Sequence, residues 1–126
     1  MKKRILMIDD DVALTQLVKF TFEATGDYEV CIENSALRGV ETARRFEPHI
    51  ILLDYIMPEM DGGELSMRLH DDPLLRRVPV IMVTAIVSSR DATNGLVERA
   101  GHLMMAKPVR FDILRHCIEQ QLVIAA

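Results

Sequence analysis

The chain has 126 residues, of which 49% are hydrophobic and 27% charged, a composition typical of a folded globular protein rather than of a disordered chain. Its 15 basic and 19 acidic side chains give a net charge of −4, which argues against a generic nucleic-acid-binding domain, because such domains carry a basic face. No apolar run approaches the roughly 20 residues of a membrane span. The apolar run near the start is ended by three aspartates, too early for a secretory signal. Both cysteines lie in apolar segments, which favours a reducing compartment. We therefore expect one soluble, cytoplasmic domain over residues 1–126.

Five short apolar runs predict five strands, at residues 5–8, 28–32, 50–53, 78–83 and 103–106. Four of them are almost unbroken in apolar character, as expected for strands that are covered on both faces of a parallel sheet. The second run alternates more, with Glu29 and Glu33 beside apolar neighbours, which predicts a strand at an edge of the sheet.

The segments between these runs have helical spacing. Apolar faces are expected on a first helix (Ala13, Leu17, Phe20 and Ala24), a second (Ala36, Val40 and Ala43) and a last (Phe111, Leu114, Ile118 and Leu122). Ser35 can cap the second helix, Gly62 and Gly63 open a short third helix that ends near residue 72, and a fourth is expected over residues 90–100. Strand and helix thus alternate five times. This pattern predicts an α/β fold with a doubly wound, five-stranded parallel sheet and helices on both faces.

Polar residues follow the predicted strands at their carboxyl ends. The acidic run at residues 9–11 follows the first strand, Asp54 the third, Thr84 the fourth and Lys107 the fifth. In such a sheet these side chains gather at one edge. Clustered carboxylates raise one another's pKa values unless a cation lies among them, and their oxygens suit Mg²⁺. A carboxylate close to a hydroxyl and an ammonium group is a plausible nucleophile toward a phosphoryl group.

Four segments together resemble the signature of response-regulator receiver domains. They are Ile8-Asp9-Asp10-Asp11, the run DYIMPEMDG at residues 54–62, Thr84-Ala85 and Lys107-Pro108. Their order and spacing also match, and the resemblance covers essentially the whole chain. It implies a flavodoxin-like three-layer sandwich with strand order 2-1-3-4-5.

The resemblance also implies the metal ligands and the phosphoacceptor. Asp54 would accept the phosphoryl group. Mg²⁺ would be held by Asp10 directly, by Asp9 directly or through water, by Asp54, and by the backbone carbonyl of Ile56. By contrast, we expect Asp11 to cap the first helix rather than to bind metal.

Two further roles follow from the resemblance. Thr84 and Lys107 would each bond a phosphoryl oxygen after transfer, and the Lys107-Pro108 peptide bond would be cis. Most receivers carry an aromatic residue three positions before this Lys-Pro pair, where it turns inward as the threonine moves. Here that switch position holds Met104, which can fill an inward or an outward pocket.

The implied function is a phosphorylation-controlled switch rather than an enzyme. A histidine kinase or phosphotransfer protein would phosphorylate Asp54, and the changed surface would bind an effector protein or an output domain. A homodimer formed on phosphorylation stays open, whereas direct binding of nucleic acid or membrane is not expected.

Two alternatives to this switch are open. One is a docking module that no longer takes phosphate, which the complete acidic set argues against and Met104 weakly favours. The other is an aspartyl-phosphate phosphatase using Asp9 and Asp11, for which 126 residues leave no room for a cap domain.

Overall fold

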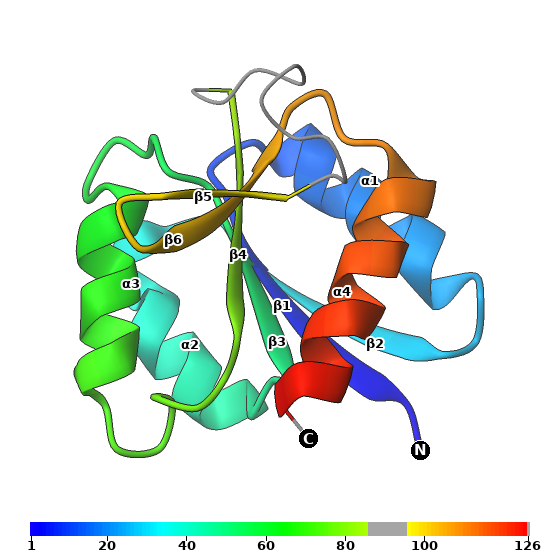
Figure 1. Cartoon of the computed structure of the whole chain (residues 1–126), viewed down its shortest axis with the longest axis horizontal. Coiled ribbons are helices and arrows are strands. Elements are labelled where there is room, and N and C mark those ends of the chain that lie inside the picture. Colours follow the sequence, from blue (N-terminus) through cyan, green and yellow to red (C-terminus); the bar gives the residue numbers. More distant parts are fainter. Residues whose placement is uncertain (86–95, 126) are drawn as a thin grey trace.

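The computed structural model describes residues 1–85 and 96–125, in which a twisted sheet lies between two layers of helices (Figure 1). The elements in chain order are β1 (Lys3–Ile8), α1 (Val12–Glu23), β2 (Tyr28–Glu33), the 3₁₀ turn η1 (Ala36–Arg38), α2 (Gly39–Phe46), β3 (Ile50–Leu53), α3 (Gly62–Asp71), β4 (Val80–Thr84), β5 (Val97–Arg99), β6 (His102–Ala106) and α4 (Phe111–Ala125). None of the helices in these described ranges has the length and apolar character needed to cross a membrane.

The sheet has the order β2-β1-β3-β4-β6-β5. The five predicted strands are parallel and lie in the expected order, with β2 at an edge, so the flavodoxin-like α/β fold is confirmed. The expectation of a purely parallel, five-stranded sheet was wrong in one respect. A sixth strand in the described part of the chain, β5, pairs antiparallel with β6 and forms the other edge.

The extra strand replaces part of a predicted helix. Residues 90–95 of that helix lie outside the described residues, but Val97–Arg99 are extended rather than helical. Ala100 and Gly101 both have positive φ, 51° and 81°, as the two-residue turn of a β-hairpin requires. Gly101 therefore closes a hairpin instead of ending a helix, and Val97 pairs with Met104.

The two faces of the sheet build two apolar clusters, because successive side chains of a strand point to opposite sides. Ile5 and Met7 of β1 face α1 and α4, whereas Leu6 and Ile8 face α2 and α3. Figure 1 shows the same division, with α1 and α4 on one side of the sheet and α2 and α3 on the other. This double cover explains why the runs in β1 and β3 are almost purely apolar.

The predicted apolar face of α1 was wrong. The helix buries Thr15, Val18 and Phe22, whereas Leu17 is half exposed and Phe20 is 74% exposed. The buried register is favoured by Phe22, whose ring packs edge-on against Tyr28 with centroids 5.2 Å apart. An apolar stripe of α1 is consequently left facing outward.

Of the two helix caps expected from the sequence, the Asp11 cap is present and the Ser35 cap is not. Asp11 and Asp61 each accept a hydrogen bond from the backbone amide three residues further on, at 3.0 and 2.8 Å. Ser35 does not cap with its side chain, because the chain first makes the η1 turn and the Ser35 hydroxyl donates to Glu59 Oε2 at 3.2 Å instead. Asp11 is therefore a helix cap, as expected, and does not belong to the carboxylate group described below.

The open edge of β2 is covered at its centre by two side chains of α1. Lys19 Nζ donates to the carbonyl of Val30 at 2.6 Å, and Glu23 Oε2 accepts from the amide of Val30 at 2.9 Å. Lys19 and Glu23 also pair with each other at 2.9 Å. Since both outward backbone groups of Val30 are already bonded, this residue has no backbone group left to pair with another strand.

Candidate functional site

The acidic residues converge because parallel strands end at the same edge of the sheet. Asp9 follows β1 and Asp54 follows β3, and the amide of Asp54 donates to the carbonyl of Ile8 at 3.0 Å. Asp9 and Asp54 are buried, whereas Asp10 is exposed. One carboxylate oxygen from each of the three lies within 4.8 Å of the others.

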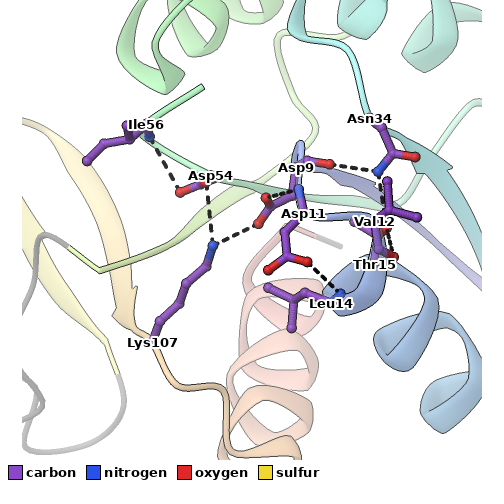
Figure 2. A network of polar contacts seen from close by, with 9 residues as sticks. All are labelled: Asp9, Asp11, Val12, Leu14, Thr15, Asn34, Asp54, Ile56 and Lys107. Carbon is purple, nitrogen blue, oxygen red and sulfur yellow. Dashed lines mark hydrogen bonds and ion pairs between the residues drawn. The ribbon is translucent and has the colours of Figure 1, made fainter. Parts of the chain in front are cut away.

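Lys107 lies between the two buried carboxylates (Figure 2). Its Nζ is 3.0 Å from Asp9 Oδ2 and 3.4 Å from Asp54 Oδ2. The residue follows β6, and its amide donates to the carbonyl of Thr84 at 3.0 Å, which continues the pairing of β6 with β4. The peptide bond from Lys107 to Pro108 is cis, as the resemblance implied.

The charges of this cluster shift one another's pKa values. Burial raises the pKa of the Asp9 carboxyl above its ordinary value, and the hydrogen bonds from the Asp11 amide and from Lys107 offset only part of that effect. Burial alone would lower the pKa of Lys107, but its hydrogen bond and charge interaction with Asp9, together with the charge of Asp54, raise it. The ammonium group therefore stays charged at neutral pH and keeps its pairing with the carboxylates.

Three carboxylates and one ammonium leave the cluster with two negative charges. Hard oxygen donors with this charge fit a divalent cation such as Mg²⁺, which is bound by a few carboxylates and completes its shell with water or phosphate oxygens. A divalent ion at this place would also remove the repulsion between Asp9 and Asp54, which the pKa of Asp9 reflects. The donor set therefore suits Mg²⁺.

The loop after Asp54 depends on a close approach of two backbones. Asp54 Oδ1 is 3.4 Å from the amide nitrogen of Ile56, whose side chain points away from the carboxylates and is 60% exposed (Figure 2). The amide of Gly62 donates to the carbonyl of Tyr55 at 2.6 Å. A Cβ atom on Gly62 would lie 2.5 Å from the carbonyl oxygen of Asp54. The two backbone segments can therefore approach this closely only because residue 62 has no side chain.

The other two residues expected at the site are buried. Thr84 ends β4 at the same edge as Asp9 and Asp54 and is fully buried. Met104 lies within β6, pairs with Met82 and Val97, and packs in the cluster on the α2 and α3 side of the sheet. The phosphoryl-binding role of Thr84 and the switch role of Met104 stay predictions, as does the ligand role of the Ile56 carbonyl.

One polar residue of this edge was not anticipated from the sequence. Asn34 Nδ2 donates to the carbonyl oxygen of Asp9 at 2.8 Å and to Thr15 Oγ1 at 3.1 Å (Figure 2). Asn34 directly follows β2, as Asp9 follows β1 and Asp54 follows β3, so the pattern of polar residues at strand ends also points to it. A lone asparagine carries no motif, however, so the sequence alone does not single it out.

Comparison with known proteins agrees with this geometry. The profile of the response regulator receiver domain matches residues 5–119. The chain belongs to the response regulator receiver domain family. It is 36% identical to the polar-differentiation response regulator DivK of Brucella ovis over 72% of this chain and 73% of that protein. It is also 36% identical to the DNA-binding dual master transcriptional regulator RpaA of Synechocystis sp., over 87% of this chain but only 44% of that protein.

The fold comparison gives the same family. A CheY-like response regulator receiver domain protein from Methanospirillum hungatei JF-1 matches with a TM-score of 0.82 and 31% identity, over 99% of this chain and 97% of that one. The chain is thus a receiver domain of the two-component signalling type.

We expect Gly62→Ala to disrupt the receiver site, because the new methyl group meets backbone atoms 2.5 Å (Asp54) and 2.8 Å (Tyr55) away. The loss of stability should be about 1–3 kcal/mol, the usual cost of overpacking, and thermal or urea unfolding measures it. Gly63→Ala is the matched control, since its methyl group would meet only side-chain atoms at 3.3 Å or more. Equal stability of the two variants would contradict this account of the loop.

Proposed function

We propose that Asp54 is the residue on which this receiver domain is phosphorylated, with Mg²⁺ bound beside it and a histidine kinase or phosphotransfer protein as the donor. The proposal includes residues 1–126 as one domain that acts in the cytoplasm as a switch and not as an enzyme for a separate substrate. The observation that carries it is the position of Lys107 Nζ, 3.0 Å from Asp9 and 3.4 Å from Asp54, beside three converging carboxylates.

The metal would be held by the carboxylates of Asp9, Asp10 and Asp54, together with the carbonyl of Ile56. When bound, Mg²⁺ supplies positive charge that offsets the charge on the oxygens of the transferring phosphoryl group. The protein itself supplies orientation, because Asp9 and Asp54 are buried on rigid strand ends. Only Asp10 among these acids is exposed, so ion and donor reach the site from its side.

The chain's own groups account for the transfer. A carboxylate oxygen of Asp54 attacks phosphorus as the bond to the donor's histidine nitrogen breaks, which gives an aspartyl-phosphate and a free imidazole. Lys107 then exchanges its ion pair with Asp54 for one with a phosphoryl oxygen, and the Thr84 hydroxyl bonds another. The movement of these two groups starts the change that an effector or output domain would read, with Met104 as the switch position.

Incubation with acetyl phosphate and Mg²⁺, followed by intact mass measurement, tests the acceptor. The wild type should gain the mass of one phosphoryl group, and Asp54→Asn should gain none. Asp11→Asn is the matched control, because it alters a neighbouring acid but keeps a side chain that caps α1 equally well. It should be phosphorylated like the wild type.

Three results would contradict the proposal. Phosphorylation of Asp54→Asn would remove Asp54 as the acceptor, absence of any gain in the wild type would indicate a docking module, and catalytic consumption of the donor would indicate a phosphatase.

The outward stripe of α1 supports a docking place for the protein donor. Val12 and Leu17 are half exposed and Phe20 is 74% exposed, so these apolar side chains face solvent in the described structure. The stripe begins two residues after Asp10 and therefore continues directly from the open side of the carboxylate cluster. A helical donor protein seated on α1 would bring its phosphohistidine to Asp54.

We expect Phe20→Asp to slow phosphotransfer from a phosphotransfer protein by about tenfold or more, the usual effect of removing an aromatic anchor from an interface. Its phosphorylation by acetyl phosphate should not change, since a small donor needs no docking surface. Leu74→Asp is the control, because Leu74 is equally exposed, at 75%, but precedes β4 at the opposite edge of the sheet. Equal slowing with both donors, or with both variants, would remove α1 as the docking place.

A further inference from the structure

The side chain of Asn34 connects the end of β2 to the turn between β1 and α1. Its amide group donates to the carbonyl oxygen of Asp9 at 2.8 Å and to Thr15 Oγ1 at 3.1 Å (Figure 2). Asn34 is half-buried and Thr15 is fully buried. Water therefore competes poorly for these bonds, and losing their donor would leave a shielded carbonyl without a partner.

The bond to Asp9 continues the β1–β2 ladder beyond its last backbone pair. The amide of Asp9 donates to the carbonyl of Glu33 at 3.1 Å, and Asn34 then binds the carbonyl of Asp9. That carbonyl lies in the same rigid peptide plane as the amide nitrogen of Asp10. Fixing this plane fixes the direction in which the Asp10 backbone starts, and with it the region that the carboxylate can reach.

The bond to Thr15 holds the other end of the acidic run. The Thr15 hydroxyl donates to the carbonyl of Val12 at 3.0 Å, in the first turn of α1. One carboxamide thus joins three parts of the fold, namely the end of β2, the end of β1 and the start of α1. Between Asp9 and the start of α1 lie Asp10 and Asp11, so the turn is held on both sides.

Asp10 needs this support more than the other two acids. The carboxylates of Asp9 and Asp54 are fixed by Lys107, whereas the Asp10 carboxylate makes no hydrogen bond or ion pair with the residues that the structure describes. Among the described residues, its backbone is therefore what sets its position. We propose that Asn34 is a positioning residue, which orients the Asp9–Asp10 peptide so that the Asp10 carboxylate is preorganised for a divalent cation. This inference rests on the proposed Mg²⁺ site.

The direct test is the Mg²⁺ affinity of Asn34→Leu, measured on the full chain by isothermal titration calorimetry. Leucine keeps the volume of the side chain but donates no hydrogen bond. We expect the dissociation constant to rise about tenfold, the lower end of the effect seen when a group that orients a metal ligand is removed. Thr15→Val removes one of the two bonds and should fall between the wild type and Asn34→Leu, which keeps the test available if the leucine variant folds poorly.

A second readout separates positioning from general damage. With acetyl phosphate as donor, the phosphorylation rate of Asn34→Leu should be low at limiting Mg²⁺ and return to the wild-type rate at saturating Mg²⁺, since Asp54 and Lys107 are intact. Thr42→Val is the matched control, because it removes a buried hydrogen bond of 2.6 Å to Glu33, beside Asn34 but away from the acidic turn. It should lower the melting temperature without changing the Mg²⁺ affinity.

Each outcome has a separate meaning. Wild-type affinity in Asn34→Leu, or equal weakening in Asn34→Leu and Thr42→Val, would overturn the positioning role. A rate that stays low at saturating Mg²⁺ would do the same. Asp10→Ala is included to test the site itself. If that variant binds Mg²⁺ as well as the wild type does, or if the wild type binds none, the proposed metal site has failed, and the fault lies there rather than with Asn34.

Discussion

Two buried carboxylates, those of Asp9 and Asp54, share one ammonium group at the carboxyl edge of the sheet, with Lys107 Nζ 3.0 and 3.4 Å from their oxygens. Burying two like charges side by side is costly unless a cation is close, and the raised pKa of Asp9 shows that burial is only partly compensated. The three groups come from β1, β3 and β6, which are not consecutive in the chain. The parallel order β2-β1-β3-β4-β6 is what brings their ends to one edge, so the chemistry of the site depends on the topology of the sheet.

The surrounding residues keep this charge cluster open to a cation while holding its geometry. Gly62 allows the loop after Asp54 to fold back, so that the Gly62 amide donates to the carbonyl of Tyr55. Asn34 binds the turn that carries Asp10, and Asp11 caps the helix that follows. These contacts leave Asp10 exposed beside two buried acids, an arrangement that suits an ion arriving from solvent together with a phosphoryl donor. The buried acids thus lie at strand ends, whereas the exposed Asp10 gives access from solvent.

Sequence patterns predicted the parts of the molecule that repeat a strong local signal. The apolar runs gave the five parallel strands, and the polar residues at their ends gave Asp9, Asp54 and Lys107. The sequence could not choose the buried face of α1, because Leu17 and Phe20 repeat as regularly as Val18 and Phe22, and only packing against Tyr28 selects the second pair. It also missed β5, since Val97–Arg99 is short and polar and becomes a strand only by pairing with β6. Asn34 was missed because its role is visible only once β2 and β1 lie side by side.

Lys107 balances the charge of Asp9 and Asp54 until a divalent ion shares that task. Calorimetric titration of Mg²⁺ into the wild type and into Lys107→Met tests this most directly, because methionine keeps the apolar stem and removes only the charge. Without Lys107 the carboxylates repel one another more strongly and gain more from the ion. We expect metal-free Lys107→Met to be less stable than the wild type and to bind Mg²⁺ at least about tenfold more tightly. A tenfold change in affinity corresponds to ~1.4 kcal/mol, which is less than the interaction of two unit charges about 4 Å apart near a protein surface. Equal or weaker Mg²⁺ binding by Lys107→Met would contradict it.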